Sequence, residues 1–325
     1  MQNIEILSLG HYVPSKRLTN ADLEKIVDTS DEWITTRTGI KERRIAGEHE
    51  KTSDLAIKAA EQALYNAKLP ALKIELIIVA TTSPDSNFPS VACLVQKGIG
   101  AKHAVAFDVS AACTGYVYAL SVAHQFLLTG MYKNALVIAA DRLTTMIDWE
   151  DRDTCVLFGD GAGACILAKG RRQGILSEHL ESFGEYGDLM KVVIPETRHP
   201  SKPKHGSGQL PYIRMRGSEL FKIAVNSMAE CTELAIKKAK IDISDVACIV
   251  PHQANDRIIA GVAKKLKIPK EKVFINIEKY GNMSAASAAV ALYEAVEVGR
   301  IRKGDYVVLV AFGAGLVSGA MVLKF

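Results

Sequence analysis

The sequence has no cysteine pair at C-x-x-C spacing and no cysteine–histidine cluster with the spacing of a zinc site. Its six cysteines are scattered over 325 residues, which argues against a disulfide framework and a zinc module. The longest apolar stretch, 311-AFGAGLVSGAMVL-323, is shorter than the about 18–20 residues that span a membrane. The opening run MQNIEILSLGHYVPSKRL lacks the apolar core of a signal peptide. We therefore expect a reduced, cytoplasmic protein that holds no metal.

The chain also has little excess of charge of either sign. The chain has 40 Lys and Arg against 36 Asp and Glu, a net charge of +4, which is too small to predict nucleic-acid binding. A mildly basic surface suits an acidic partner. Hydrophobic residues make up 48% of the chain, which provides a large core and excludes a disordered or fibrous protein. The length predicts about two domains.

Strand-like and helix-like runs alternate along the chain, the pattern of an α/β protein. In the first half we expect helices at 54–69 and 111–130, strands at 75–82, 104–110 and 135–141, and a hairpin formed by 154–158 and 164–169. The second half repeats this order with helices at 220–239 and 281–299 and strands at 246–251, 273–277 and 306–312. An internal repeat of this kind predicts two similar structural units.

Two spacings recur between the halves. Cys113 to Gly130 and Asn282 to Gly299 are both 17 residues, and Ser83 to Cys113 and His252 to Asn282 are both 30. We infer two similar halves, residues 1–170 and 171–325, related by a pseudo-twofold axis. This symmetry brings Cys113, His252 and Asn282 together where the halves meet, which is where clefts form.

These three residues fit a reactive thiol with two hydrogen-bond donors. Cys113, in 110-SAACTG-115, precedes a predicted helix whose dipole lowers a thiol pKa. The alternatives are a buried apolar cysteine, a histidine that bonds only locally and an asparagine that caps a helix. The matched positions in the repeat favour catalysis.

Three other segments contain glycine-rich or proline-rich patterns that are compatible with a functional role. The run 159-GDGAGA-164 matches a dinucleotide fingerprint, but strand-like residues follow it where that fingerprint opens a helix, so we reject a nucleotide site. The turn 312-FGAGLVSG-319 offers backbone N–H groups for an oxyanion or is merely a tight turn. The run 198-RHPSKPKHGSG-208 is either a mobile flap or an inert surface loop.

Long motifs in a fixed order make the chain resemble β-ketoacyl-acyl-carrier-protein synthase III, the initiating condensing enzyme of type II fatty-acid synthesis. These motifs are 19-TNADLEKIVDTSDEWITTRTGIKERRIA-46, 110-SAACTGYVYALSVA-123, 158-FGDGAGA-164, 251-PHQANDRI-258 and 280-YGNMSAAS-287. The resemblance implies the α/β thiolase fold, an αβαβα sandwich of two similar halves, in a homodimer. It also implies that no cofactor is needed, since the CoA and phosphopantetheine thioesters are substrates.

By resemblance, Cys113 is the nucleophile that takes an acyl group, acetyl foremost, from acyl-CoA. His252 and Asn282 then promote decarboxylation of malonyl-acyl-carrier protein, whose enolate attacks the acyl thioester. The backbone N–H groups of Cys113 and Ala314 hold the oxyanion. Ala314 stands where the family commonly has the second of three glycines, and Met283 replaces a common threonine.

The resemblance also implies contacts with the substrates. The residues resembling coenzyme A contacts are Thr29, Trp33, Arg37, Arg152 and Asn255, with Trp33 and Arg152 sandwiching adenine. Those resembling the docking surface for an acidic carrier protein are Gln253, Ala254, Asn255, Asp256, Arg257, Lys264 and Lys265. Phe88 resembles the residue that closes the partner's acyl pocket across the dimer.

Two other functions remain open from the sequence. The same chemistry with a different acyl-CoA primer would serve branched-lipid, cofactor or secondary-metabolite synthesis. A non-catalytic subunit that binds carrier protein would be expected to lack Cys113, His252 or Asn282, and all three are present. A degradative thiolase is disfavoured because 312-FGAGLVSG-319 lacks a second cysteine.

Overall fold

The computed structural model describes residues 3–170, 174–192 and 211–325. The segment 198–208, for which the sequence suggests a flap or a surface loop, lies outside the described residues. Among the described helices, none is both long enough and apolar enough to cross a lipid bilayer.

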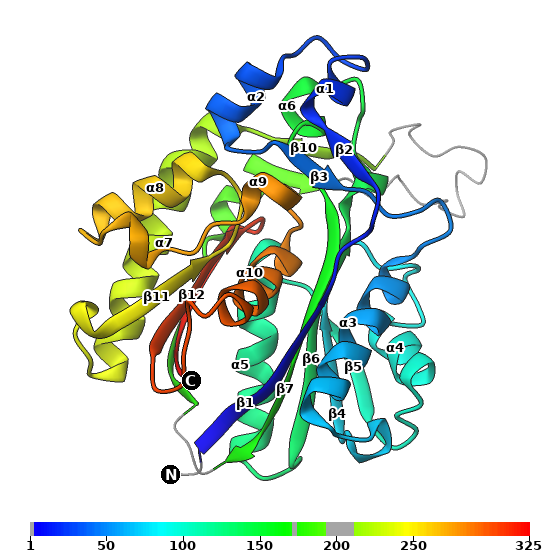
Figure 1. The fold of residues 1–325 in the computed structure, drawn as a ribbon, viewed down its shortest axis with the longest axis vertical. Helices are drawn as coiled ribbons and strands as arrows, with labels where there is room; N and C mark the ends of the chain where they lie inside the picture. The colour runs from blue at the N-terminus through cyan, green and yellow to red at the C-terminus, as the bar shows by residue number, and fades with distance from the viewer. Residues whose placement is uncertain (1–2, 171–173, 193–210) are drawn as a thin grey trace.

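Two sheets form the framework of the fold (Figure 1). The first contains, in spatial order, β1 (Asn3–Tyr12), β7 (Asp160–Gly170), β6 (Asn134–Arg142), β4 (Leu76–Ala80) and β5 (Val105–Val109). The second contains β11 (Val246–Pro251), β12 (Tyr306–Gly313), β13 (Val317–Lys324) and β8 (Ile175–Ser182). In the first sheet β4 pairs in parallel with both β5 and β6, and in the second sheet β11 pairs in parallel with β12. Parallel pairing is expected when helices connect the strands.

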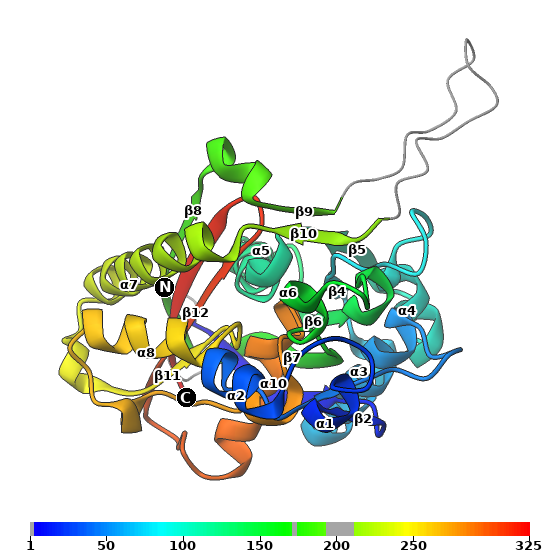
Figure 2. The same ribbon diagram turned by 90° about the horizontal axis from the view of Figure 1, so that it is seen from above.

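Helices cover both faces of both sheets. The middle layer is formed by α5 (Gly115–Leu128) and α10 (Ala285–Glu297), and the outer layers by α3 (Thr52–Ala67) and α4 (Val91–Ile99) on one side and α7 (Gly217–Ala239) and α8 (Asp256–Lys265) on the other. Figure 2 shows the five layers in succession. The sandwich predicted from the resemblance is therefore confirmed.

Side-chain alternation along the strands explains the layering. In β4, Ile78 packs with the middle helices, whereas Ile77 and Val79 pack with α3 and α4. In β12, Leu309 faces the middle layer and Val308 faces α7. Because successive strand residues point to opposite faces, continuous apolar runs are required in strands that are buried on both sides.

The membership of the sheets changes between Gly170 and Ile175, since β7 is the last strand of the first sheet and β8 belongs to the second. The division into halves at 1–170 and 171–325 stays a prediction. Gly130 and Gly299, which follow the two middle helices, have φ angles of 79° and 73°. Only glycine adopts this left-handed conformation without strain.

The predicted hairpin at 154–169 is wrong. Residues 152–155 form the short helix α6 (Arg152–Cys155), and Asp160–Gly170 is the single strand β7, which pairs with both β1 and β6. A β-carbon on Gly163 would lie 2.4 Å from that of Ala289 in α10. The glycines therefore allow a helix to approach the strand closely, and they do not mark a turn.

The predicted strand at 273–277 is reduced to one bridge, between Val273 and Ile249. The side chain of Gln253 replaces strand pairing here. Its Nε2 donates to the Phe274 carbonyl at 3.2 Å, and its Oε1 accepts from the Asn276 N–H at 3.1 Å. The second sheet consequently ends at β11.

Small elements gather at one end of the sandwich, above the ends of the middle helices (Figure 1). They are β2 (Arg17–Thr19), α1 (Asn20–Leu23), α2 (Asp31–Thr38), β3 (Glu42–Arg44), α6, α9 (Ile277–Tyr280), β9 (Met190–Val192) and β10 (Ile213–Met215). Together with the strand ends, several of them enclose the cavities described next.

Candidate active site

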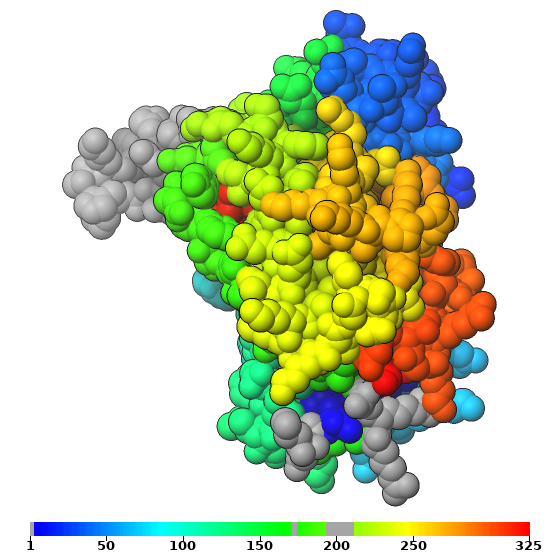
Figure 3. Space-filling view, turned by 90° about the vertical axis from the view of Figure 1, so that its left-hand side faces the viewer, coloured from blue at the N-terminus to red at the C-terminus, as the bar shows by residue number. Residues whose placement is uncertain are grey.

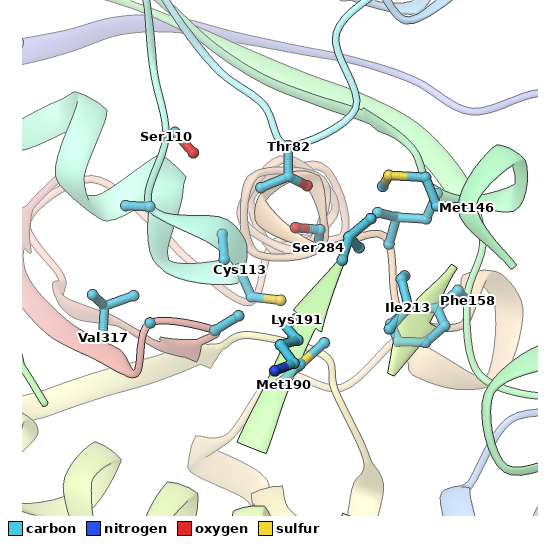
Figure 4. Close-up of a pocket in the computed structure, with 16 residues that line it drawn as sticks. Thr82, Ser110, Cys113, Met146, Phe158, Met190, Lys191, Ile213, Ser284 and Val317 are labelled. Carbon is cyan, nitrogen blue, oxygen red and sulfur yellow. The ribbon is translucent and has the colours of Figure 1, made fainter. Parts of the chain in front are cut away.

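Cys113 lies in the one-turn 3₁₀ helix between β5 and α5, and 6% of it is exposed. The preceding residue, Ala112, has a φ of +44°, a left-handed conformation that costs a residue with a β-carbon free energy. This turn directs the Cys113 Sγ into a cavity (Figure 4). Strain beside a buried thiol is typical of a functional position.

His252 directly follows β11 and is 2% exposed. Its backbone N–H donates to the Val310 carbonyl at 2.7 Å, which fixes the residue to β12. The ring Nδ1 is buried and has no hydrogen-bond partner among the described residues. Burial lowers the pKa of His252 to about 3, so the imidazole is neutral at physiological pH.

Asn282 is held by its backbone on both sides. Its N–H donates to the Leu157 carbonyl at 2.8 Å, and its carbonyl accepts from the Gly159 N–H at 2.9 Å. The side-chain Oδ1 accepts from the Ser284 N–H at 2.8 Å, which leaves the NH₂ group as the end that can donate to a substrate. Helix α10 begins only at Ala285, so Asn282 is not its N-cap.

Cys113, His252 and Asn282 line one cavity of about 140 Å³, together with Phe312 and Gly313. The repeat predicted this convergence, and the structure brings the three residues to the same space. The cavity is mostly apolar, and its polar side chains are the thiol, the imidazole, the Asn282 amide and, toward the groove, Asn255. In such a low-dielectric space a hydrogen bond to a developing negative charge is strong.

Cys113 also lines a second cavity of about 410 Å³ on the other side of the thiol. Its walls include Leu143, Met146, Phe158, Met190, Ile213 and Val317 (Figure 4). Sequence reasoning missed these lining residues, because they come from separate segments and carry no local motif. The thiol therefore stands between the smaller cavity, which it shares with His252 and Asn282, and this larger one.

A third hollow, of about 510 Å³, leads from the first cavity to the surface. Leu157, Phe221 and Asn255 line both spaces. Trp33 and Arg37 of α2 stand farther out in the same groove. A long substrate could thus lie along the groove with its reactive end at Cys113.

The expected lowering of the Cys113 pKa is wrong. Burial raises the pKa of the thiol to about 12, although a hydrogen bond with Ser284 acts in the opposite direction. The desolvation of the thiolate outweighs the position at a helix start. The resting nucleophile is therefore a neutral thiol, and its proton must leave when the sulfur is acylated. Neutral His252 is a base in the same cavity.

The turn between β12 and β13 lies against the nucleophile. A β-carbon on Gly313 would stand 2.7 Å from the Cys113 nitrogen, and Ala314 lines the larger cavity with Cys113. Ala314 is not left-handed, and the positive φ of this turn, 142°, falls on Gly315. The alanine is therefore compatible with the backbone of this loop.

Three of the five residues expected to contact coenzyme A line the groove, namely Trp33, Arg37 and Asn255, and a fourth, Arg152, contacts Trp33 from beside it. The Arg152 guanidinium carbon is 4.8 Å from the centre of the Trp33 ring. Asn255 Nδ2 donates to the Arg37 carbonyl at 3.1 Å. Thr29 does not line the groove, and its hydroxyl is buried without a hydrogen-bond partner among the described residues.

The residues expected to dock a carrier protein differ in exposure. Arg257, Lys264 and Lys265 are exposed on α8, which lies on the surface beside α7 (Figure 3), whereas Ala254, Asn255 and Asp256 are half-buried where the helix begins. Gln253 is 1% exposed, and its amide bonds only internal backbone groups. Gln253 therefore cannot contact a partner and instead holds the turn that follows His252.

Phe88 lies in the turn between β4 and α4 and is 85% exposed. It lines none of the three cavities described above. Its ring is accessible to a second chain, and Tyr65 is nearly as exposed, at 83%.

Known proteins match the chain over both site-bearing segments. Residues 107–184 match the family described as 3-oxoacyl-[acyl-carrier-protein] synthase III, and residues 236–325 match its C-terminal part. A β-ketoacyl-[acyl-carrier-protein] synthase III of Clostridioides difficile (strain 630) is 52% identical over 320 residues, 98% of each chain.

Solved structures agree with this match. The crystal structure of 3-oxoacyl-[acyl-carrier-protein] synthase III from Aquifex aeolicus VF5 is 48% identical, covers 99% of this chain and 100% of its own, and superposes with a TM-score of 0.93. The priming β-ketosynthase of the R1128 polyketide pathway is 32% identical, covers 99% and 96%, and has a TM-score of 0.92.

Proposed function

Because the chain belongs to the 3-oxoacyl-[acyl-carrier-protein] synthase III family, we propose that it condenses a short acyl-CoA with malonyl-acyl-carrier protein. The products are 3-oxoacyl-acyl-carrier protein, CoA and CO₂. Acetyl-CoA is the primer that we expect first. The reaction starts fatty-acid elongation.

One observation carries the proposal: Cys113, His252 and Asn282 line the same cavity, at the inner end of a groove that opens to the surface. A condensing enzyme needs a nucleophile to hold one acyl group and donors to stabilise the enolate of the other. A hydrolase would instead need a positioned water.

In the first step, the Cys113 sulfur forms a thioester with the acyl group while the bond to the CoA sulfur breaks. The thiol proton passes through the neutral His252 imidazole to the departing CoA thiolate. The oxyanion of this step is held by the backbone N–H groups of Cys113 and Ala314, which the close approach of Gly313 brings near each other.

In the second step, the malonyl carbon loses CO₂, and the electron pair of the broken bond forms an enolate on the thioester. His252 and the Asn282 amide donate hydrogen bonds to the enolate oxygen. The enolate carbon attacks the acyl group on Cys113, and the sulfur leaves as a thiolate that takes up a proton from solvent. Neither donor needs to be charged, which is consistent with the lowered pKa of His252.

The groove and α8 are proposed to bind the two carriers. Coenzyme A would be held by Trp33, Arg37, Arg152 and Asn255. Thr29 does not line the groove and would not contact coenzyme A directly. Arg257, Lys264 and Lys265 would attract the acidic carrier protein, with Ala254, Asn255 and Asp256 at the rim. Electrostatic attraction of this kind raises the association rate and is weakened by salt.

We further propose that the enzyme works in the cytoplasm as a homodimer and needs no cofactor. All six cysteines are free, as in a reducing compartment. The exposure of Phe88 supports a partner subunit that covers it. These proposals can be tested by fractionation, by sedimentation and by assay of the purified protein without additions.

A larger primer is the second candidate. The apolar cavity beside Cys113 measures about 410 Å³, compared with about 150 Å³ for an engineered cavity that binds benzene. An acetyl group would leave much of this space empty, so a branched or longer acyl chain fits the observation. A panel of acyl-CoA primers with malonyl-acyl-carrier protein would identify the preferred chain.

The decisive experiment for the function follows labelled acyl-CoA onto the protein and then into product. We expect label on Cys113, none on Cys93 or Cys155, and transfer to 3-oxoacyl-acyl-carrier protein when malonyl-acyl-carrier protein is added. The Cys113→Ser variant should take up no thioester label. Label spread over several cysteines, or acylation without condensation, would contradict the proposal.

A further inference from the structure

A group of side chains of the types that bind metal ions lies away from the active site, between β8 and α7. Within the described part of the chain, His179, Glu181 and Cys231 are the only three such residues whose ligand atoms all lie within 4.8 Å of one another. His179 and Glu181 come from β8, and Cys231 comes from α7. Sequence spacing could not reveal the group, because Cys231 is 50 residues from Glu181.

The strand geometry aims the first two side chains at the helix. Residues two apart on a strand share a face, and the Ser177 hydroxyl on that same face donates to the Ala235 carbonyl of α7 at 2.6 Å. His179 Nε2 is 2.7 Å from Glu181 Oε1, and Cys231 Sγ is 3.6 Å from Glu181 Oε2. One carboxylate therefore contacts both other ligands.

We propose that His179, Glu181 and Cys231 bind one divalent ion of the zinc type. Imidazole nitrogen, carboxylate oxygen and thiolate sulfur are the three donor types that Zn²⁺ takes in proteins. Tetrahedral zinc at ordinary bond lengths separates such donors by about 3.4–3.6 Å. Cys231 Sγ and Glu181 Oε2 already meet this separation. His179 Nε2 must withdraw from Glu181 Oε1 by less than about 1 Å and, lying within 4.8 Å of Cys231 Sγ, must come to the same separation from it.

An ion can reach the site from solvent, and the three ligands leave a fourth coordination position free for water. The side chains of His179 and Glu181 are 19% and 24% exposed, whereas Cys231 is fully buried. The site thus has a buried anchor and an open side. On binding, the Cys231 thiol loses its proton to solvent and the metal–sulfur bond forms, with no change of oxidation state.

The ion would fasten α7 to β8 close to the active site. Leu220, Phe221 and Ala224 of α7 line the cavity of His252, and Glu181 pairs with Ser318 of β13. The Tyr118 hydroxyl of α5 donates to the Glu181 carbonyl at 2.9 Å. Occupancy would consequently stabilise the wall around the nucleophile. This inference does not depend on the proposed reaction.

The test uses Co²⁺ and Zn²⁺ on the full-length protein in a Cys113→Ser background, which removes the active-site thiol as a competing ligand. We expect one equivalent of Co²⁺ to bind with a thiolate-to-metal charge-transfer band, and one equivalent of Zn²⁺ to displace it. Cys231→Ser should abolish the band, whereas Cys248→Ser, which alters another fully buried cysteine, should retain it.

Two partly exposed ligands give an independent test if Cys231→Ser does not fold. Loss of a residue that hydrogen-bonds a metal ligand typically weakens metal binding by about 10–100-fold. His179→Gln and Glu181→Gln each remove a ligand itself, so each should weaken Co²⁺ binding by more than this. Excess Zn²⁺ should raise the Tm of the parent and leave that of His179→Gln unchanged. Absence of the band in the parent, or unchanged affinity in both variants, would overturn the proposal.

Discussion

Gly313 approaches Cys113 so closely that a β-carbon on the glycine would lie 2.7 Å from the Cys113 nitrogen. In the proposed mechanism this contact forms the oxyanion site, because it places the turn containing Ala314 beside the backbone N–H of Cys113. A side chain at position 313 would have to push the two segments apart.

We therefore predict that Gly313→Ala slows acylation of Cys113 by about 10²–10³-fold, the usual cost of losing one oxyanion donor. Transfer of labelled acyl groups measures the effect. Gly184→Ala is the matched control, since a β-carbon there meets no atom within 4 Å. Acylation of Gly313→Ala at the parental rate would show that the turn does not form the oxyanion site.

The Trp33–Arg152 pair leads to a prediction about coenzyme A. The guanidinium carbon lies 4.8 Å from the ring centre, so adenine can enter only if Arg152 moves away from the ring. Losing a cation–π partner costs about 0.5–2 kcal/mol, or about 2–30-fold in affinity. Trp33→Ala and Arg152→Ala should each raise the KM for acyl-CoA by this factor.

The KM for malonyl-acyl-carrier protein is the internal control for both variants. It should stay near the parental value, because the carrier protein delivers its own phosphopantetheine without an adenine. Arg17→Ala, which alters an arginine that lines none of the three cavities, should change neither constant. Equal increases for the two substrates would contradict the adenine assignment.

Burial of His252 predicts how stability depends on pH. Its pKa is lowered from 6.5 to about 3, so between these values the unfolded chain binds a proton that the folded protein does not. Stability contributed by this group is present above about pH 6.5 and is lost as the pH falls toward 3.

We therefore expect the free energy of unfolding to fall more steeply below about pH 6.5 in the parent than in His252→Gln. The variant removes one titrating group, and buried carboxyls such as Asp141 and Asp160, whose pKa values are raised by burial, contribute equally to both proteins. Denaturant unfolding at several pH values measures the difference. Parallel profiles would show that His252 is not buried in neutral form.

Sequence reasoning succeeded where local motif and repeat coincide. The matched spacings of Cys113 and Asn282 predicted their convergence with His252, and the apolar runs predicted most strands of both sheets. Apolar runs and helix ends are local signals, which depend on neighbouring residues, and the repeat relates two such local patterns to each other.

It failed where distant residues decide the outcome. The glycines around Gly163 serve a close contact with Ala289 inside one strand, where the sequence suggested a turn, and the Gln253 amide bonds the Phe274 carbonyl, where the sequence suggested a further strand. The Cys113 pKa depends on how completely the fold removes water from the thiol. A local sequence pattern does not report which side chains the fold brings against a given segment.

The separate roles of Cys113 and Asn282 are the central claim, and one measurement tests it most directly. Acyl transfer to Cys113 and CO₂ release from malonyl-acyl-carrier protein are followed separately in Asn282→Ala, with His252→Ala and the double variant alongside. In the proposed mechanism the Asn282 amide donates to the enolate oxygen and not to the acyl oxyanion, so acylation should stay near the parental rate.

CO₂ release should fall by about 10²–10³-fold in Asn282→Ala. The double variant should lose less than the product of the single losses, because both donors serve one oxygen. If Asn282→Ala abolishes acylation and leaves CO₂ release intact, the assignment is contradicted and Asn282 acts with the nucleophile.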